Sequence, residues 1–239
     1  MKEFKLQNLD IQPESVEVRS FCNISFSFSL EFDLPKDSFL IFRLRGGRNN
    51  KNDWYLMQAE DPNRQGFVRL SSNKNTFVLP IAITGKELLV KYLICEEDGI
   101  RKDSILNIEI FNTLAQSLVE KNKKIEIFVE FENKSKIKAS NPPSINVFHK
   151  EFDHMKLICP SIVYVNKSFN LHTRIEDKFK NLVKDFKGII RFSILTENDS
   201  KIKCEQQKAG MFLLITTDLE KFNDKRILVE YKGQISVEF

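Results

Sequence analysis

The segment between Phe39 and Leu70 has the residue types best suited to binding a ligand. It contains the only Trp of the chain and the densest mixture of arginine, glycine and aromatic residues. Guanidinium groups beside an indole suit a carboxylate, a phosphate or the face of a sugar ring. The candidate ligand-binding residues are therefore Arg43, Arg45, Arg48, Trp54 and Tyr55.

A structural role for the same arginines is the alternative interpretation. Acidic side chains in the same segment, at Asp53, Glu60 and Asp61, could pair with the arginines and hold a long loop in place. Loop arginines commonly serve this purpose, so the sequence favours pairing over ligand binding.

Residues for catalysis are not arranged in any recognisable pattern. The chain has three histidines, His149, His154 and His172, and no His-x-His pair, which is too few donors for a metal-activated water. The sequence lacks the glycine-rich phosphate loop, the dinucleotide fingerprint and the Gly-x-Ser-x-Gly elbow. His149, Asp153 and His154 form at best a weak surface metal site, and satisfied linker residues are the favoured interpretation. We therefore expect no catalytic residue, no metal site and no cofactor.

The four cysteines are isolated along the chain and form no Cys-x-x-Cys pair. Cysteines of this kind are usually small core residues, although disulfides stay open as an alternative. They are Cys22, Cys95, Cys159 and Cys204.

Charge and hydropathy exclude two classes of partner. The formal net charge is +4 over 239 residues, and basic side chains are spread among acidic ones, so nucleic-acid binding is not expected. No apolar run approaches the ~20 residues of a membrane span, and the N-terminal residues lack the apolar core of a signal peptide. We expect no membrane partner and a cytoplasmic location.

The elements that position these residues are strands. Residues 39–45 alternate, which predicts a strand with one buried face. One side has Leu40, Phe42 and Leu44, and the other has Ile41, Arg43 and Arg45. Residues 22–32 show the clearest alternation, apolar side chains at even positions and mostly serine between them.

Further strands are expected throughout the first half of the chain, and one short helix. Phe128 interrupts the polar side of the strand at residues 125–131 and suggests contact with a second surface, such as a neighbouring domain. Leu114, Ala115, Leu118 and Val119 have helical spacing. The other expected strands are residues 76–83, 87–95 and 105–111.

Two domains follow from the turn and linker signals. Ser140–Pro143 is the best linker signal, residues 144–148 close the first domain, and the boundary is expected near His149. The pattern of the second half predicts roughly seven short strands in about 90 residues, the spacing of a small sandwich. They are expected at residues 155–159, 162–165, 169–175, 189–195, 211–216, 226–231 and 235–239. No βαβ alternation occurs. We therefore predict an all-β chain of two tandem antiparallel β-sandwich, immunoglobulin-like domains, a larger one at residues 1–148 and a smaller one at 149–239.

Three segments carry a family resemblance that spans most of residues 30–195. They are RGGRNNKNDWYLMQAEDP with GFVRL, LVKYLICEEDGIRKDSILNIEIFNT with SLVEKNKKIEIFVEF, and ICPSIVYVNKSFNLHTRIEDKFKNLV. In these segments the chain resembles a family of uncharacterised proteins in which two N-terminal β-domains precede a large PHP-type metallophosphoesterase-like domain. The resemblance covers the β-region alone, and no catalytic residue is carried over.

Three functional hypotheses remain. The favoured one is a non-catalytic accessory region that presents surfaces to another protein or to a covalently linked enzyme domain. The second is a carbohydrate-binding module that stacks sugars on Trp54 and Tyr55 and binds them through Arg43 or Arg48. The third is a subunit that pairs through an exposed sheet edge.

Overall fold

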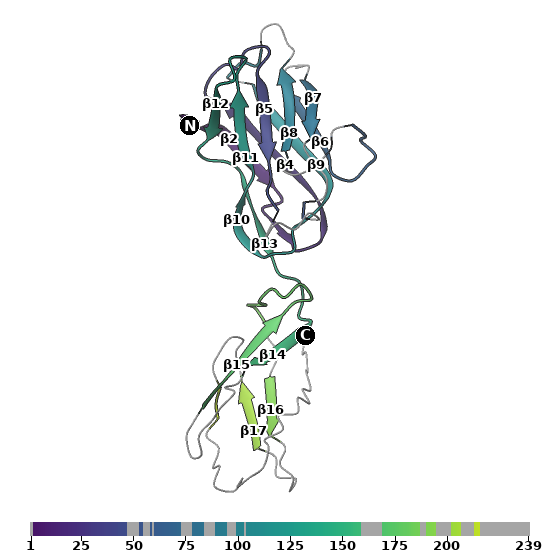
Figure 1. The fold of residues 1–239 in the computed structure, drawn as a ribbon, viewed down its shortest axis with the longest axis vertical. Helices are drawn as coiled ribbons and strands as arrows, with labels where there is room; N and C mark the ends of the chain where they lie inside the picture. Colours follow the sequence, from purple (N-terminus) through teal and green to yellow (C-terminus); the bar gives the residue numbers. More distant parts are fainter. Residues whose placement is uncertain are drawn as a thin grey trace. The chain divides into compact units, whose positions relative to one another are not determined.

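The structure is a computed structural model, and its regular elements are all strands. No helix occurs among the residues that it describes, so the fold is all-β. The chain divides into two compact units, unit 1 at Met1–Phe148 and unit 2 at His149–Phe239 (Figure 1). The described residues are 2–46, 53–54, 58, 60–72, 78–83, 89–94, 99–102, 104–158, 169–186, 190–194, 202–206 and 213–215.

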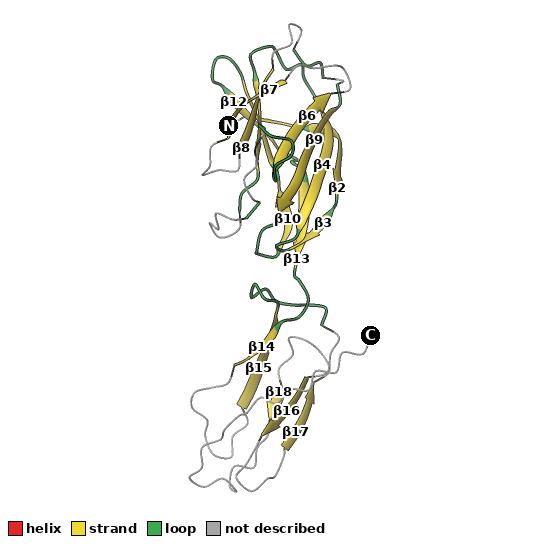
Figure 2. Cartoon of the chain, turned by 90° about the vertical axis from the view of Figure 1, so that its right-hand side faces the viewer, coloured by secondary structure: helices red, strands yellow, loops and turns green. Residues whose placement is uncertain are grey.

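The described residues of unit 1 form three sheets, seen from two sides in Figures 1 and 2. The six-stranded sheet has the order β1 (Lys2–Phe4), β12 (Lys136–Ala139), β11 (Glu126–Glu130), β5 (Phe39–Arg43), β8 (Leu89–Ile94) and β7 (Val78–Ile83). The four-stranded sheet has the order β2 (Leu6–Gln12), β4 (Phe21–Leu30), β9 (Leu106–Leu114) and β6 (Phe67–Ser72). A third sheet joins β10 (Glu120–Lys124), β13 (Ser144–Phe148) and β3 (Ser15–Glu17).

Aromatic side chains join the two larger sheets of unit 1. On β4, Ile24, Phe26 and Phe28 are buried and point to one face, as the alternation in this segment predicts. The ring centroid of Phe42 on β5 lies 6.0 Å from that of Phe26 and 6.5 Å from that of Phe28. The four-stranded and six-stranded sheets therefore pack face to face around a phenylalanine-rich core.

Strand β5 is more buried than its alternation predicts. Leu40, Ile41 and Phe42 are all at most 3% exposed, although Ile41 lies on the opposite face from Phe42. Phe128 of β11 lies beside Ile41 in the strand register and is also buried. The outer face of this sheet thus has its own apolar layer, covered by charged side chains.

The pairing of unit 1 is not wholly antiparallel. β1 pairs with β12 and β3 pairs with β13 in parallel, which differs from the prediction. Both pairs bring the first residues of unit 1 beside its last ones, and parallel pairing at such a separation leaves no local signal in the sequence.

The segment between β9 and β10 is not the helix that its spacing predicts. It is an irregular connection held by backbone hydrogen bonds, from Ala115 N to Ser20 O at 2.9 Å and from Arg19 N to Ala115 O at 3.2 Å. Ala115 and Gln116 are fully buried. Tertiary contacts determine the conformation of this segment and override the helical spacing of its apolar residues, so the helix prediction is wrong.

Unit 2 contains three antiparallel strand pairings in its described residues. β15 (Phe169–Glu176) lies between β14 (His154–Ile158) and β18 (Leu213–Ile215), and β16 (Ile190–Ile194) pairs with β17 (Ile202–Gln206). The expected strands at residues 162–165, 226–231 and 235–239 lie outside the described residues. Among the described residues of both units, none belongs to a helix with the length and apolarity that a membrane crossing needs.

Candidate functional site

The structure buries Trp54 completely. Its indole Nε1 donates a hydrogen bond to Gln116 Oε1 at 3.1 Å, and its backbone N donates to Leu114 O at 2.7 Å. A fully buried indole has no face available for a sugar. This contradicts the expectation that Trp54 forms an exposed stacking platform, and the carbohydrate hypothesis loses its main support.

The side chain of Asp53 is also buried, and its described contacts lie away from the candidate arginines. Its Oδ1 accepts a hydrogen bond from the backbone N of Ser117 at 2.9 Å and lies 3.9 Å from an Arg19 nitrogen. Asp53 and Trp54 thus attach the start of this segment to the irregular connection after β9.

Arg43 and Arg45 are ion-paired, but with a partner that the sequence did not indicate. Both Nε atoms contact Glu126 Oε2 on β11, at 2.7 Å from Arg43 and 3.3 Å from Arg45. Asp61, one of the acids expected to pair with them, instead lies 3.4 Å from Arg64. The other two candidate residues, Arg48 and Tyr55, lie outside the described residues.

A charged cluster covers the outer face of the six-stranded sheet around Glu126 and Phe128. Lys138 Nζ donates to Glu126 Oε1 at 2.7 Å. The Phe128 ring centroid lies 4.7 Å from the Arg43 guanidinium, 4.8 Å from Lys136 Nζ and 5.6 Å from Lys138 Nζ. We call this cluster the Glu126 surface; it comprises Arg43, Arg45, Glu126, Phe128, Lys136 and Lys138.

The electrostatics of this surface are dominated by its cations. Burial alone would raise the pKa of Glu126, but the hydrogen bonds and charges of Arg43 and Lys138 outweigh it and lower the pKa from 4.5 to about 2. Two rim carboxylates, Glu3 and Glu130, lie opposite Lys138 and Lys136 in the strand register. The four cations of the surface still outnumber the carboxylates.

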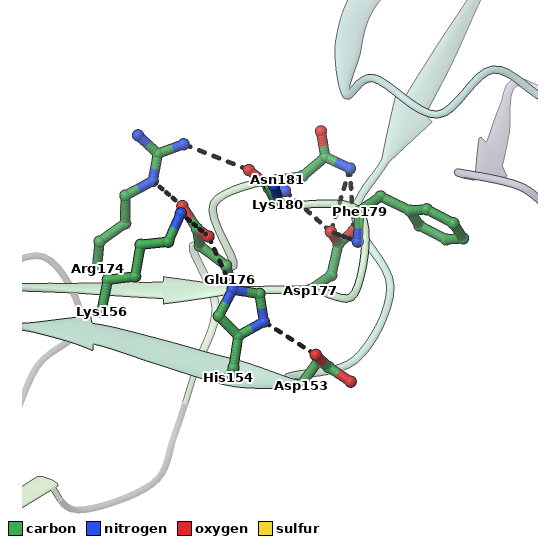
Figure 3. Close-up of polar contacts among 9 residues, drawn as sticks. All are labelled: Asp153, His154, Lys156, Arg174, Glu176, Asp177, Phe179, Lys180 and Asn181. Carbon is green, nitrogen blue, oxygen red and sulfur yellow. Dashed lines mark hydrogen bonds and ion pairs between the residues drawn. The ribbon is translucent and has the colours of Figure 1, made fainter. Parts of the chain in front are cut away.

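Unit 2 has a second polar cluster, centred on a buried carboxylate at the end of β15 (Figure 3). The side chain of Glu176 is 1% exposed and accepts from Lys156 Nζ at 2.9 Å. Arg174 Nε and His154 Nε2 also contact this carboxylate, the latter at 3.0 Å. Figure 3 shows the three side chains converging on Glu176 from β14 and β15.

The turn after β15 is organised by a second buried carboxylate, that of Asp177. Its Oδ1 accepts from the backbone N atoms of Phe179 and Asn181, each at 2.9 Å, and its Oδ2 accepts from Lys150 N at 3.1 Å. Burial would raise the pKa of Asp177, but these hydrogen bonds, with that of the Asn181 side chain, lower it. Asp177 therefore ties the first residues of unit 2 to the turn.

Of the three residues of the weak metal-site hypothesis, Asp153 and His154 contact each other at 2.9 Å, whereas the contacts given for His149 are with other residues. His149 Nε2 lies 3.0 Å from Asp185, whereas His154 lies between Asp153 and Glu176. Within the residues that the structure describes, no three histidine, cysteine or acidic side chains are grouped as metal ligands.

Sequence reasoning missed Glu126, Lys136, Lys138 and the Glu176 cluster. One signal was present for the first of these sites. Phe128 stands on an otherwise polar strand face, and the structure covers it with cationic side chains from β5 and β12 of unit 1. The Glu176 cluster left no comparable signal.

Comparisons with known proteins assign no family to this chain. No protein-family model and no curated protein matches the chain. Among solved structures, the chain is similar to the crystal structure of BslA, a bacterial hydrophobin, with 13% sequence identity and a TM-score of 0.34. The similarity covers 59% of this chain and 96% of BslA. A similarity this low supports no argument about function.

Proposed function

We propose that this chain is a non-catalytic accessory region that binds an acidic segment of a protein partner or of a linked enzyme domain. The Glu126 surface is the observation that carries the proposal. It gathers four cationic side chains on one exposed sheet face around a single central carboxylate.

The chemistry of this surface favours a carboxylate-rich partner. Arg45 is 64% exposed and contacts Glu126 through Nε. A guanidinium has five N–H donors, so Arg45 retains donors for a further carboxylate. Lys136 is exposed beside the Phe128 ring. An acidic segment lying along β11 would meet both cations, because Arg45 contacts Glu126 at one end of this strand and Lys136 lies opposite Glu130 at the other. Its binding would weaken with added salt.

The proposal extends to architecture and location. Both units would be immunoglobulin-like β-sandwiches in tandem, and the chain would act in the cytoplasm. The face-to-face sheets of unit 1 and the antiparallel pairs of unit 2 support the first point. The resemblance of residues 30–195 to β-domains that accompany a PHP-like domain suggests an enzyme of that type as the linked or separate partner.

Binding of a fluorescein-labelled polyglutamate peptide tests the surface. We expect fluorescence anisotropy to report binding at low salt, and the double variant Arg45→Glu, Lys136→Glu to weaken it at least about tenfold. The matched control is Arg64→Glu, Lys102→Glu, which makes the same charge change at exposed positions outside the Glu126 surface. Equal losses in both double variants, or no binding by the natural chain, would contradict the proposal.

The non-catalytic part of the proposal has its own assay. The purified chain, incubated with divalent metals and generic phosphoester substrates, should give no turnover above the rate of buffer with metal. A metal-dependent rate that a point substitution in the chain abolishes would refute it.

A further inference from the structure

His154 lies between two carboxylates, one at each ring nitrogen. Nδ1 is 2.9 Å from Asp153 Oδ2, and Nε2 is 3.0 Å from Glu176 Oε2 (Figure 3). An ionised carboxylate can only accept hydrogen bonds. Both contacts are therefore hydrogen bonds only when both ring nitrogens carry protons, which is the imidazolium form of His154.

The neutral form of His154 satisfies one of these contacts and not the other. Its single N–H donates to one carboxylate, and the lone pair of the other nitrogen faces an oxygen that has no proton. Histidine is the side chain that ordinarily changes charge between about pH 5 and pH 8. The number of hydrogen bonds at this position thus depends on whether His154 is protonated.

One of the two carboxylates lies just after the junction between the units, and the other is at the end of β15. Asp153 is part of the segment of residues 149–153 that comes directly after the last residue of unit 1. Its backbone N donates to Glu176 O at 3.0 Å, and Lys150 N donates to Asp177 Oδ2 at 3.1 Å. The imidazolium adds a side-chain bridge to these backbone contacts.

We propose that His154 is a pH-sensitive clamp that fastens the junction segment 149–153 onto the end of β15. The clamp is closed at acidic pH, where the imidazolium joins Asp153 to Glu176. It is open at alkaline pH, where one of the two bonds is lost. The junction segment then keeps its other contacts, which include the hydrogen bonds of Asp153 N and Lys150 N and the packing of the Phe152 ring against Phe186.

The charged groups around His154 set the conditions for this clamp. Lys156 on its own strand and Arg174 on β15 both contact Glu176, and Asp153 adds a second negative charge beside His154. The two positive and two negative charges therefore balance when His154 is neutral. Burial raises the pKa of Glu176, but Lys156, Arg174 and His154 together lower it. Glu176 therefore stays ionised wherever imidazole titrates, and the proton on His154 decides the state of the clamp.

His149 offers an internal contrast. Its Nδ1 is 2.8 Å from Lys150 O, and its Nε2 is 3.0 Å from Asp185 and 3.4 Å from Lys184 N. When neutral, it donates from Nδ1 to the carbonyl and accepts from Lys184 N at Nε2. The side chain of Asp185 is 77% exposed and can turn to water. His149 therefore has partners in both forms and should not impose the same pH dependence.

Amide hydrogen exchange by NMR on the full chain tests the clamp. We expect the protection factor of the Asp153 amide, corrected for intrinsic exchange, to fall about fivefold between about pH 5.5 and pH 8. His154→Gln should remove this dependence, whereas His149→Gln should retain it. Ring nitrogen shifts should show His154 protonated at both nitrogens at the acidic end.

The outcomes separate the clamp from a purely structural histidine. A protection factor with no pH dependence, an equal dependence in His154→Gln, or a singly protonated ring at the acidic end would each overturn the proposal. If His154→Gln does not fold, as judged by circular dichroism, Asp153→Ala removes the Nδ1 acceptor and should at least halve the dependence.

Discussion

The indole of Trp54 donates its hydrogen bond to Gln116 at 3.1 Å, with both side chains fully buried. Gln116 Nε2 in turn donates to Leu118 O at 2.8 Å and to Glu120 Oε2 at 3.0 Å. This glutamine therefore fixes both the tryptophan and the irregular connection after β9. The φ of Trp54 is 54°, which L-residues rarely adopt, so its surroundings must hold it.

Replacement of Gln116 by leucine should destabilise unit 1 by about 2 to 3 kcal/mol, because it leaves the buried indole N–H without its acceptor. Trp54 is the only tryptophan, so its fluorescence during urea unfolding reports unit 1 alone. A Gln116→Leu chain as stable as the natural one would contradict this role.

Glu126 should make unit 1 sensitive to acid. Its pKa is lowered to about 2 on folding, so its stabilisation is present above about pH 4.5 and lost as the pH falls toward 2. The side chain is 16% exposed, and the shift corresponds to at most about 3 kcal/mol. At neutral pH, Glu126→Gln should therefore unfold at lower urea, and near pH 2 the difference should largely vanish.

The control for this experiment is Glu14→Gln, at an exposed position of unit 1 with no resolved contact to the Glu126 surface. Its unfolding should follow the natural chain at both pH values. The difference in stability between the natural chain and Glu126→Gln could instead be the same at both pH values. That result would show that the substitution removes packing rather than a charge interaction.

Gly99 should tolerate no side chain. Its φ is 65°, and an added Cβ would lie 2.1 Å from the backbone oxygen of Leu34. Leu34 and Ile100 exchange two backbone hydrogen bonds, at 2.7 and 2.8 Å, so this oxygen is fixed. Gly99→Ala should cost about 3 kcal/mol or more in urea unfolding. Gly99→Asn separates the causes, because asparagine accepts positive φ readily and yet has the same Cβ. If Gly99→Asn loses little stability, the positive φ alone, and not the contact of the added Cβ with Leu34 O, causes the loss in Gly99→Ala.

The Cys22 thiol should react slowly with alkylating reagents. Burial raises its pKa to about 11, and its Sγ lies 3.7 Å from Thr113 O. Because the thiolate is the nucleophile, iodoacetamide near pH 8 should label this cysteine about 100-fold more slowly than in the urea-unfolded chain. Peptide mass spectrometry isolates Cys22 from the other cysteines. Labelling at the unfolded rate would contradict the burial.

The sequence predicts elements whose signal is local. The alternation at residues 22–32 predicts β4, and the structure confirms it at Phe21–Leu30 with Ile24, Phe26 and Phe28 buried. The turn signal at Gly99 was also present in the sequence. Period and turn chemistry depend on neighbouring residues, which a single sequence displays.

Contacts between distant residues account for what the sequence did not predict. Arg43 and Glu126 are 83 positions apart, and only the register of β5 against β11 brings them together. His154 was noticed as a possible metal ligand, but its partner Glu176 lies on another strand. Charged residues that are plentiful along a chain have many possible partners until strand pairing selects one.

The parallel pairs at the start of unit 1 have a consequence for its biosynthesis. β1 pairs with β12, and β3 pairs with β13, so neither N-terminal strand can form its pairing until the later strand has been synthesised. A ribosome releases these partners last, so the N-terminal strands must wait unpaired while more than a hundred residues emerge. Unit 1 should therefore complete its fold only after Phe148 has left the exit tunnel, and nascent chains arrested earlier should be open to protease.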